Sequence, residues 1–511
     1  MNAHVRRTFY LFVAGFAALI GMLAYWQVYA RESLANNPEN SLQTRRAIES
    51  PRGLILARDG ETVLARSVKQ PSESGNPTYE RVYPQGPLYA GVVGYWSTRY
   101  GATGIEIAEN SNLSGTADPA TLDELINQIS GGPRPGNNVI LTIDPQLQRL
   151  AYELLAASNT GRGSAVAVDP ETGEVLALVS HPSYDPNNID ERFQELQQDP
   201  SQPLLNRATQ GLYPPGSVFK VVTAAAALKS GVSPSDVFYD DGSYEQPGYT
   251  VTNYGGAAYG RVTFAQALAL SINTVFARVA VEEVGRQMLY ATARDFGFGS
   301  SYEEFPLEVS PSRLGDGNLA QIAFGQDTVL SNVFQMALVA ATVANDGNMM
   351  EPHLVKEVRS PDGIIIERSS PQKEREVLDP QTASTLQEMM VGVVESGSAT
   401  AAQIPGVEVA GKTGTAEVPP DAPHSWFIAF APADDPQIAV AVLVENGGDG
   451  EKQALPIARQ IIASYLDVPS RAPRQQGQPP AVPQLPEGLP QDLPGRLQGL
   501  PQRIFGEDGR P

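Results

Sequence analysis

The 511-residue sequence contains no cysteine, which excludes disulfide frameworks, zinc ribbons, iron–sulfur clusters held by cysteine and thiol catalysis. Histidine is almost as scarce: its four residues form no HExxH motif or other dense cluster, so the sequence argues against a histidine-bound catalytic metal. We therefore expect neither a metal nor a cofactor. Lysine is also rare, with seven residues against 29 arginines, so a lysine inside a motif carries more information than usual.

Positive charge is in short supply as well. The net charge is −21 at pH 7, and a surface of that sign repels nucleic acid. Charged residues make up only 18% of the chain and apolar residues 41%, which is enough to bury a core and excludes wholesale disorder. The length is compatible with roughly three folded units at most.

One long uncharged run occupies residues 8–30, close to the amino terminus. As a helix it would be about 34 Å long, enough to cross a hydrocarbon layer of about 30 Å. Two arginines precede the run and an Arg-Glu pair follows it, so the positive-inside rule predicts a cytoplasmic tail at 1–7 and a single-pass protein whose remaining chain lies outside the cytoplasm. The alternative is a cleaved signal peptide ending near residue 30, but signal peptides usually have shorter apolar regions of about 7–15 residues.

The remaining chain divides into three parts. Residues 31–155 have a mixed pattern and end in a strand followed by a helix that Asp144 caps. Residues 156–468 start with a predicted β-hairpin, continue as helices and end with strands and a helix, which indicates one α/β sheet assembled from both ends of this part. Ten of the 43 residues in 469–511 are proline, a composition typical of disorder. The predicted helices are 218–228, 264–270, 275–284 and 455–466, and the predicted strands are 139–143, 165–168, 175–179, 407–410, 426–430 and 438–444.

Ser217 and Lys220 stand at the start of the first of these helices. Two prolines end any helix upstream, so Ser217 lies at a helix N-terminus, where free backbone N–H groups and the helix dipole favour developing negative charge. Lys220 lies one turn later on the same face and is an available base for a serine nucleophile, because histidine is rare. The pattern alone is weak: a plain capping serine is the alternative, and the same spacing recurs at 370–373, in a polar stretch that we interpret as a solvated loop.

A second polar pair, Ser271 and Asn273, separates two predicted helices and can point into a cleft. Helix capping is the alternative interpretation, and residues 74–76 match the same Ser-x-Asn pattern in what reads as a turn. The third pattern, Lys-Thr-Gly at 412–414, follows a predicted strand. Composition predicts only about 0.03 chance matches to it, so it is informative, although a turn of small residues is its alternative.

Ser-x-x-Lys, Ser-x-Asn and Lys-Thr-Gly in this order resemble the motifs of the penicillin-recognising serine acyltransferases. Residues 52–60, with shorter pieces at 104–106 and 113–115, resemble the pedestal domain of class B penicillin-binding proteins. Residues 165–187 resemble the opening of their transpeptidase domain, and 325–326 and 424–427 match comparable family runs. The resemblance covers about residues 31–466, and its short pedestal is most similar to that of the PbpA-like members. The middle residue of the second motif is isoleucine, where some members have aspartate.

This resemblance implies the fold. We expect an α/β (α+β) transpeptidase domain of the penicillin-binding and serine β-lactamase type over residues 156–468, with a central antiparallel sheet flanked by helices. A small mixed α/β pedestal of the dimerisation type would occupy residues 31–155 and follow the membrane anchor helix at 8–30.

The resemblance also implies the chemistry of peptidoglycan cross-linking. Ser217 would attack the penultimate carbonyl of a stem peptide ending in D-Ala-D-Ala, release D-Ala and pass the acyl group to an amine of a neighbouring stem peptide, and β-lactams would trap the same serine. Lys220 would be the base, Ser271 would relay a proton to the leaving amine, and Asn273 would hold Lys220 and bind the substrate amide. Backbone N–H groups of Ser217 and Thr415 would form the oxyanion hole. The implied carboxylate-binding segment comprises Lys412, Thr413, Gly414 and Thr415.

Four other functions fit parts of the pattern. A D,D-carboxypeptidase is disfavoured by the pedestal signature, a β-lactamase by the lack of an assignable deacylating carboxylate, and a non-catalytic β-lactam sensor or scaffold by the complete set of motifs. A bifunctional enzyme would need a second catalytic domain, for which residues 31–137 are too few. The resemblance instead implies a SEDS-type membrane glycosyltransferase as the partner that polymerises glycan.

Overall fold

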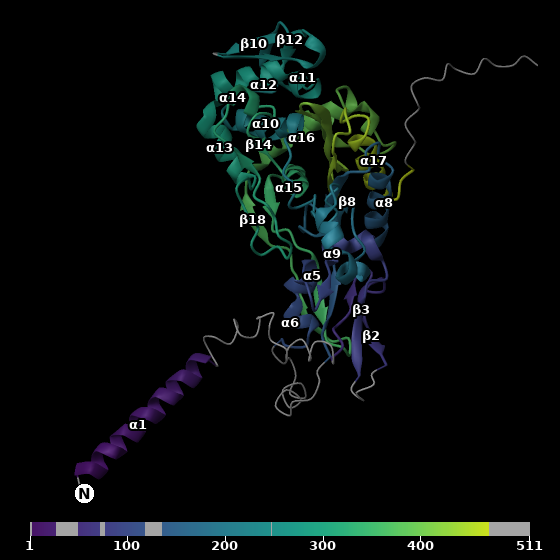
Figure 1. Cartoon of the computed structure of the whole chain (residues 1–511). Coiled ribbons are helices and arrows are strands. Elements are labelled where there is room, and N and C mark those ends of the chain that lie inside the picture. The colour runs from purple at the N-terminus through teal and green to yellow at the C-terminus, as the bar shows by residue number, and fades with distance from the viewer. Residues whose placement is uncertain (1–2, 27–49, 72–76, 118–134, 247, 470–511) are drawn as a thin grey trace, which may run out of the picture. The chain divides into compact units, whose positions relative to one another are not determined.

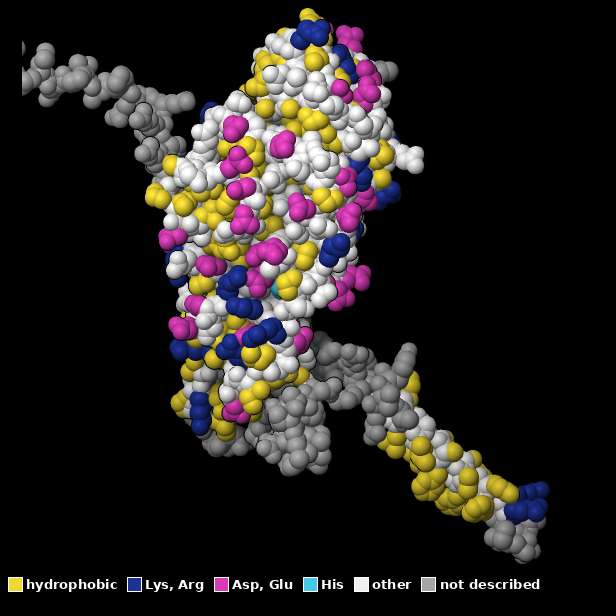
Figure 2. Space-filling model, turned by 180° about the vertical axis from the view of Figure 1, so that it is seen from behind, with side chains coloured by type: hydrophobic (Ala, Val, Ile, Leu, Met, Phe, Trp, Pro, Cys, Tyr) yellow, Lys and Arg dark blue, Asp and Glu magenta, His cyan; other side chains and the backbone are white. Residues whose placement is uncertain are grey.

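The computed structural model describes residues 3–26, 50–71, 77–117, 135–246 and 248–469 (Figure 1). The predicted turn at 74–76 and the proline-rich tail from residue 470 lie outside these ranges. Helix α1 (Ala3–Ala24) contains one stretch, Arg6–Leu23, that is long and apolar enough to cross a membrane, and apolar side chains cover its surface (Figure 2). It is a candidate membrane anchor, whose predicted end at residue 30 lies outside the described residues.

A six-stranded sheet forms the base of the structure, in the order β17-β16-β6-β1-β2-β3. The predicted strand at 139–143 is present as β6, which pairs in parallel with β1 and antiparallel with β16. Strands β16 and β17 come from far along the chain, and the sequence did not predict that β16 pairs with β6. The strands are β1 (Ile55–Leu56), β2 (Val63–Gln70), β3 (Thr78–Val82), β6 (Asn138–Leu141), β16 (Val355–Arg359) and β17 (Ile365–Arg368).

A buried carboxylate, Glu106 in helix α5 (Gly104–Ala108), holds this lower part together. One of its oxygens accepts from Arg52 at 2.8 Å and the other from Arg81 at 2.6 Å, and all three side chains are almost completely buried. Burial alone would raise the pKa of Glu106, but the charges of Arg81 and Arg52 outweigh it and the pKa is lowered. Arg52 also donates to Asn110, so this cluster ties the segment before β1 to the helices at 104–113.

Helix α8 (Pro145–Ala156) leads from the first sheet to the second. Its N-cap is Asp144, as predicted, whose carboxylate accepts from the N–H groups of Gln146 and Leu147. The second sheet is antiparallel, in the order β19-β20-β21-β7-β8, and it joins strands from both ends of residues 156–468, which confirms the prediction. Its strands are β7 (Gly163–Val168), β8 (Val175–His181), β19 (Ala410–Val418), β20 (Asp421–Ala431) and β21 (Ile438–Val444).

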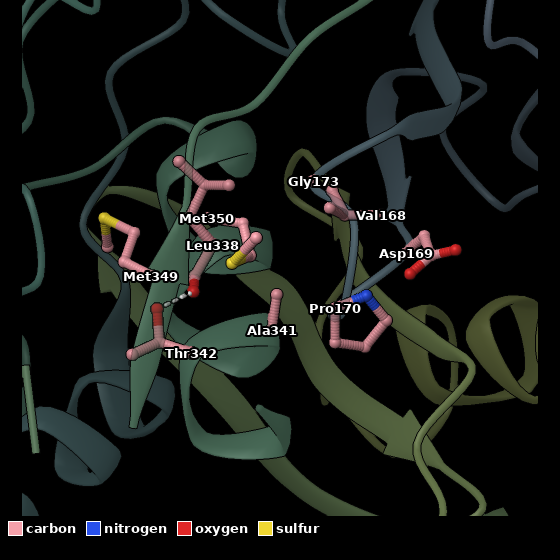
Figure 3. A pocket seen from close by; sticks show the side chains of 9 residues that line it. All are labelled: Val168, Asp169, Pro170, Gly173, Leu338, Ala341, Thr342, Met349 and Met350. Carbon is pink, nitrogen blue, oxygen red and sulfur yellow. Dashed lines mark hydrogen bonds between the residues drawn. The ribbon is translucent and has the colours of Figure 1, made fainter. Parts of the chain in front are cut away.

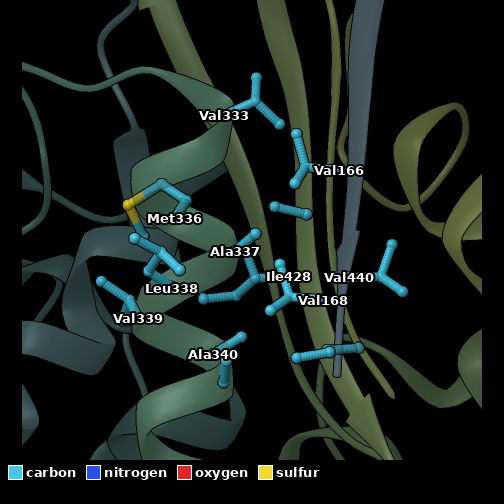
Figure 4. Close-up of a cluster of buried hydrophobic side chains, with 14 of the residues drawn as sticks. Val166, Val168, Val333, Met336, Ala337, Leu338, Val339, Ala340, Ile428 and Val440 are labelled. Atoms are coloured by element: carbon cyan, nitrogen blue, oxygen red, sulfur yellow. The ribbon is translucent and has the colours of Figure 1, made fainter. Parts of the chain in front are cut away.

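Helices cover both faces of this sheet. The fully buried helix α15 (Val333–Ala344) packs on β7, β20 and β21, with side chains such as Ala337 facing Val166 and Ile428 (Figure 4). Helices α8 and α17 (Ala454–Tyr465) pack on the other side. Because both faces of the sheet are covered, side chains on both sides of the central strands are buried, and the sequence of these strands is continuously apolar.

The predicted helix at 218–228 is a 3₁₀ turn, η4 (Gly216–Phe219), followed by α10 (Lys220–Lys229). The helices predicted at 264–270 and 275–284 are α11 (Phe264–Ala269), α12 (Asn273–Val279) and a π-helical turn, η6 (Ala280–Val284). Above them stands a small lobe of two two-stranded sheets, in which β9 (Val237–Asp240) pairs with β12 (Gly260–Thr263) and β10 (Ser243–Gln246) pairs with β11 (Tyr249–Thr252). The apolar periodicity thus predicted helices at 218–228, 264–270 and 275–284, but not the 3₁₀ turn η4 or the π-helical turn η6.

Two predictions about residues 156–468 were wrong. The strand predicted at 407–410 starts only at Ala410 and runs to Val418, so the Lys-Thr-Gly motif lies inside a strand instead of after one, because pairing with β20 outweighs the weak strand preference of its glycines. The second Ser-x-x-Lys match is only partly a loop: Lys373 starts the exposed strand β18 (Lys373–Glu376), which pairs with β15 (Asn348–Met350).

The remaining helices and strands connect these parts. They are η2 (Gly86–Tyr89), α4 (Ala90–Val93), β4 (Trp96–Ser97), β5 (Gly101–Ala102), α6 (Asn110–Leu113), η3 (Pro186–Asn188), α9 (Ile189–Gln198), η5 (Tyr254–Gly256), α13 (Gly285–Asp295), β13 (Arg313–Leu314), α14 (Leu319–Ile322), β14 (Val329–Leu330), α16 (Pro380–Glu395) and η7 (Thr400–Ala402).

We predict that Glu106→Gln destabilises the protein by about 3–5 kcal/mol, because it leaves two buried guanidinium groups without a counter-charge. Chemical unfolding measures this loss. Glu195→Gln is the matched control: it removes an ion pair with Arg192 that is exposed to solvent, and we expect little change. Similar effects of the two substitutions would contradict a structural role for the buried cluster.

Candidate active site

Ser217 lies in the 3₁₀ turn that leads into α10, at the N-terminal end of the helical segment, as predicted. Neighbouring segments hold this turn in place. The Gly216 N–H donates to the Gly325 carbonyl at 2.9 Å, and the Trp426 indole donates to the Pro214 carbonyl at 2.9 Å. Gly325 has φ +75°, and a Cβ there would lie only 2.1 Å from the Gly216 carbonyl oxygen. Only glycine fits this close approach.

Ser271 and Asn273 lie at the junction of α11 and α12, between the two predicted helices. Ser271 adopts φ +59°, a left-handed conformation that non-glycine residues rarely hold without functional or structural reason. Asn273 is the first residue of α12. The junction presents three oxygens to one point: the hydroxyl and carbonyl of Ser271 and the side-chain amide oxygen of Asn273.

Lys220 is the point where these groups meet. Its Nζ lies 3.2 Å from Ser217 Oγ, 2.7 Å from the Ser271 carbonyl oxygen, 3.2 Å from Ser271 Oγ and 2.6 Å from Asn273 Oδ1. The side chain is fully buried, with Nζ 5.5 Å from the centre of the Phe276 ring and 6.0 Å from that of Phe324.

A neutral amine fits this environment. A neutral lysine has two N–H donors and one lone pair. The two shortest contacts go to oxygens that can only accept, the Ser271 carbonyl and Asn273 Oδ1, so they use both donors. The lone pair is then left for a hydroxyl, and Ser217 Oγ is in reach of it.

Lys412, in strand β19, enters from the opposite side. Its Nζ donates to Ser271 Oγ at 2.9 Å and to the Thr413 carbonyl at 2.9 Å, so the Ser271 hydroxyl lies between the two lysines. Thr413 Oγ1 is 2.8 Å from Ser398 Oγ, a neighbour that sequence reasoning missed and that no local pattern indicates.

Burial changes the protonation of both lysines. It lowers the pKa of Lys412 to about 7. Burial also lowers the pKa of Lys220 well below its ordinary value of 10.5, and the positive charge of Lys412 lowers it further. Because two ammonium groups on one hydroxyl would repel each other, a protonated Lys412 favours the neutral form of Lys220.

Strand β19 is pressed against the turn that carries Ser217. A Cβ on Gly414 would lie 2.9 Å from Val218 Cγ1, and one on Gly216 would lie 2.9 Å from the Thr415 carbonyl oxygen. The Thr415 hydroxyl accepts from the Gly450 N–H at 3.3 Å, which fixes the strand from its other side. The structure thus gathers Ser217, Lys220, Ser271, Asn273 and the segment 412–415 around one site.

Elsewhere, the described residues offer little alternative chemistry. A hollow lined by Met349, Met350 and Pro170, between α15 and the turn after β7, contains none of the site residues (Figure 3). Within the described ranges, no three His, Asp or Glu side chains are grouped as a metal site would require. Acyl transfer by a serine with a lysine base is therefore the chemistry that the described arrangement serves best.

Comparison with known proteins gives matches over both folded parts of the chain. Residues 163–463 match the family described as the penicillin binding protein transpeptidase domain, and residues 52–139 match the penicillin binding protein A dimerisation domain. The peptidoglycan D,D-transpeptidase PbpA of Mycolicibacterium smegmatis is 39% identical over 494 residues, which cover 91% of this chain and 99% of the relative. The protein of the same name from Mycobacterium tuberculosis H37Rv is 37% identical, with the same coverage of both chains.

Solved structures agree with these matches. Penicillin-binding protein A of M. tuberculosis, as its imipenem acyl-enzyme complex, has a TM-score of 0.77 at 37% identity and covers 82% of this chain and 99% of its own. Its penicillin G acyl-enzyme complex has a TM-score of 0.75 at 37% identity, covering 82% of this chain and 100% of its own.

We predict that Gly325→Ala slows the acylation of Ser217 by a fluorescent penicillin at least about 100-fold, because the new methyl group displaces the turn that carries the serine. Rapid-quench labelling measures the rate. Gly363→Ala is the matched control, since that residue also has a positive φ, +86°, but nothing lies within 4 Å of an added Cβ. If both variants are acylated like the wild type, the close approach of Gly325 does not position Ser217.

Proposed function

This chain belongs to the penicillin-binding protein transpeptidase family, and on that premise we propose that it is a monofunctional peptidoglycan D,D-transpeptidase that forms its acyl-enzyme on Ser217. The observation that carries the proposal is the Lys220 amine, buried beside the Ser217 hydroxyl with both of its N–H groups directed to other acceptors. The substrate is a peptidoglycan stem peptide ending in D-Ala-D-Ala, and β-lactams compete for the same serine.

Acylation begins when Ser217 Oγ attacks the penultimate D-Ala carbonyl carbon and its proton passes to Lys220. The carbonyl becomes an oxyanion, which the backbone N–H groups of Ser217 and Thr415 stabilise. The C–N bond to the last D-Ala then breaks. Ser271 Oγ gives its proton to the departing amine and is reprotonated from the lysine pair on either side of it. The products are D-Ala and an ester on Ser217.

Substrate recognition uses the segment 412–415. Protonated Lys412, together with the hydroxyls of Thr413 and Thr415, attracts the terminal carboxylate, and Gly414 keeps the strand free of a side chain toward the serine turn. Asn273 holds Lys220 through Oδ1 and binds the substrate amide.

An amine of a second stem peptide resolves the ester. It attacks the acyl carbon and passes a proton to Lys220, the bond to Ser217 Oγ breaks, and Lys220 returns the proton to Ser217 Oγ. The new amide is the cross-link. If water replaced the amine the enzyme would be a D,D-carboxypeptidase, and without turnover it would be a β-lactam sensor. The resemblance of 91% of the chain to proteins named D,D-transpeptidases supports an amine as the acceptor.

The arrangement in the cell is part of the proposal. Residues 1–7 form a cytoplasmic tail, 8–30 the anchor, 31–155 the pedestal, 156–468 the transpeptidase domain outside the cytoplasm and 469–511 a proline-rich tail. The apolar helix and the two arginines before its uncharged run support this orientation. Reporter fusions after residue 30 test it, since a reporter active only in the cytoplasm should be inactive there.

The partner that we propose is a SEDS-type membrane glycosyltransferase, because the two matched families are described as a transpeptidase domain and a dimerisation domain and neither as a glycosyltransferase. Co-purification of the full chain with such a polymerase from membranes tests this pairing, and its absence from cross-linked complexes would count against it.

We predict that Ser217→Ala abolishes labelling by fluorescent penicillin, because the variant has no hydroxyl to form the ester. Gel fluorescence measures it. Ser370→Ala, in the second Ser-x-x-Lys match, is the control and should label like the wild type. Equal labelling of Ser217→Ala and wild type would refute the nucleophile. Release of D-Ala from a stem peptide, with and without an added amine, then separates cross-linking from hydrolysis.

We predict a bell-shaped pH dependence of the acylation rate. The rate rises with pH as Lys220 loses its proton, at a pH well below its ordinary pKa of 10.5. It falls again as pH rises through about 7, where Lys412 loses the charge that attracts the carboxylate. Stopped-flow acylation between pH 5 and 10 checks this, and a rate that climbs continuously to pH 10 would contradict both assignments.

A further inference from the structure

Asp240, at the end of β9, is a buried carboxylate that takes no direct part in the chemistry above. It is 2% exposed. Its oxygens accept hydrogen bonds from four separate points: the Gly242 N–H at 3.1 Å, the Tyr259 N–H at 2.8 Å, Asn253 Nδ2 at 2.9 and 3.0 Å, and Thr274 Oγ1 at 2.6 Å. Burial alone would raise the pKa of Asp240, but these hydrogen bonds outweigh it and lower the pKa, so the group is ionised at neutral pH.

Two of those donors belong to a clamp at the start of α12. Asn253 Oδ1 accepts from the Thr274 N–H at 3.1 Å, and the side chains of both residues donate hydrogen bonds to the Asp240 carboxylate. The clamp therefore fixes the segment 252–253 of the small lobe against residues 273–274.

Thr252 and Asn273, which precede Asn253 and Thr274 in the chain, also contact each other. Asn273 Nδ2 donates to the Thr252 carbonyl at 3.2 Å, and this bond decides which end of the Asn273 amide faces the site. With Nδ2 engaged by the lobe, Oδ1 points to Lys220 Nζ at 2.6 Å. A flipped amide would present N–H donors to the amine and compete for its lone pair.

We propose that Asp240 is a positioning residue for acyl transfer: by clamping residues 252–253 to the start of α12, it fixes the Asn273 amide so that the Lys220 lone pair stays directed at Ser217. This inference rests on the proposed role of Lys220 as the base. The carboxylate acts at a distance, through Asn253 and Thr274, and touches neither substrate nor the reacting atoms.

The chemistry of the position requires an acid rather than an amide. All the groups that contact Asp240 are donors, and two carboxylate oxygens can accept from all of them. An asparagine would turn an NH₂ group toward at least one donor, which breaks the clamp without changing the shape of the side chain. The nearby cation Arg278 is engaged elsewhere, since it donates to the Tyr239 carbonyl.

The first test is Asp240→Asn in the full chain, with fluorescent penicillin as the probe. We expect the second-order acylation rate to fall about 10- to 100-fold, because the Asn273 amide and the Lys220 amine lose their fixed orientation. We also expect the acid limb of the pH–rate profile to move to lower pH. Asn273 Oδ1 stabilises the protonated form of Lys220, so loosening it lowers that pKa further.

A matched control separates this effect from loss of stability. Asp379 caps α16 and accepts from Gln381 N–H, Thr382 N–H and Thr382 Oγ1, so Asp379→Asn also removes a carboxylate that accepts three hydrogen bonds, none of them from a site residue. It should lower the melting temperature and leave the acylation rate and acid limb unchanged. If Asp240→Asn behaves in the same way, the positioning role is refuted.

A second pair of variants keeps the carboxylate in place. Thr274→Val removes the hydroxyl that donates to Asp240, whereas Thr274→Ser keeps it. We expect Thr274→Val to shift the acid limb in the same direction as Asp240→Asn, and Thr274→Ser to resemble the wild type. In the double variant, the rate effects of Asp240→Asn and Thr274→Val should not multiply, because both act on the same clamp. Equal profiles for Val and Ser would overturn the clamp. Labelling of Ser217→Ala would overturn the proposed function instead, so the two failures are distinguishable.

Discussion

Burial of the Lys220 amine is the constraint on which the rest of the structure depends. In water a lysine is protonated at neutral pH and cannot take a proton from serine. Here the amine is enclosed by α10, α12 and two phenylalanine rings, with a second lysine nearby, so the neutral form is favoured. Its donors are then used by the Ser271 carbonyl and Asn273, and Ser217 meets the remaining lone pair.

The two sheets supply the rigidity that such an environment requires. β19 brings Lys412 to the site only because β20, β21 and β7 hold it in register, and α15 fills the space behind them. The small lobe supports the opposite wall through Asp240 and Asn253. The catalytic groups thus come from segments almost 200 residues apart in the chain, each fixed by packing that is remote from the chemistry.

Much of this arrangement was predictable from local patterns. Asp144 as a helix cap, the hairpin of β7 and β8, and β21 over 438–444 followed from capping chemistry and apolar runs. The error at β19 arose because Gly411 and Gly414 weaken a strand pattern, whereas pairing with β20 over its length restores the strand. The pairing of β16 with β6 was not predictable, since residues 355–359 carry no local mark of a partner more than 200 positions earlier.

By itself, the sequence determined the residue types of the candidate site and their order, because Ser-x-x-Lys, Ser-x-Asn and Lys-Thr-Gly are local patterns, and it determined the apolar helix near the amino terminus. Only the tertiary structure decided that Lys220 and Lys412 share the Ser271 hydroxyl, that Ser271 takes a left-handed conformation and that Asp240 clamps the start of α12. The physical reason is that a pKa and an amide orientation depend on everything that surrounds a group, and those surroundings come from parts of the chain that no sequence window contains.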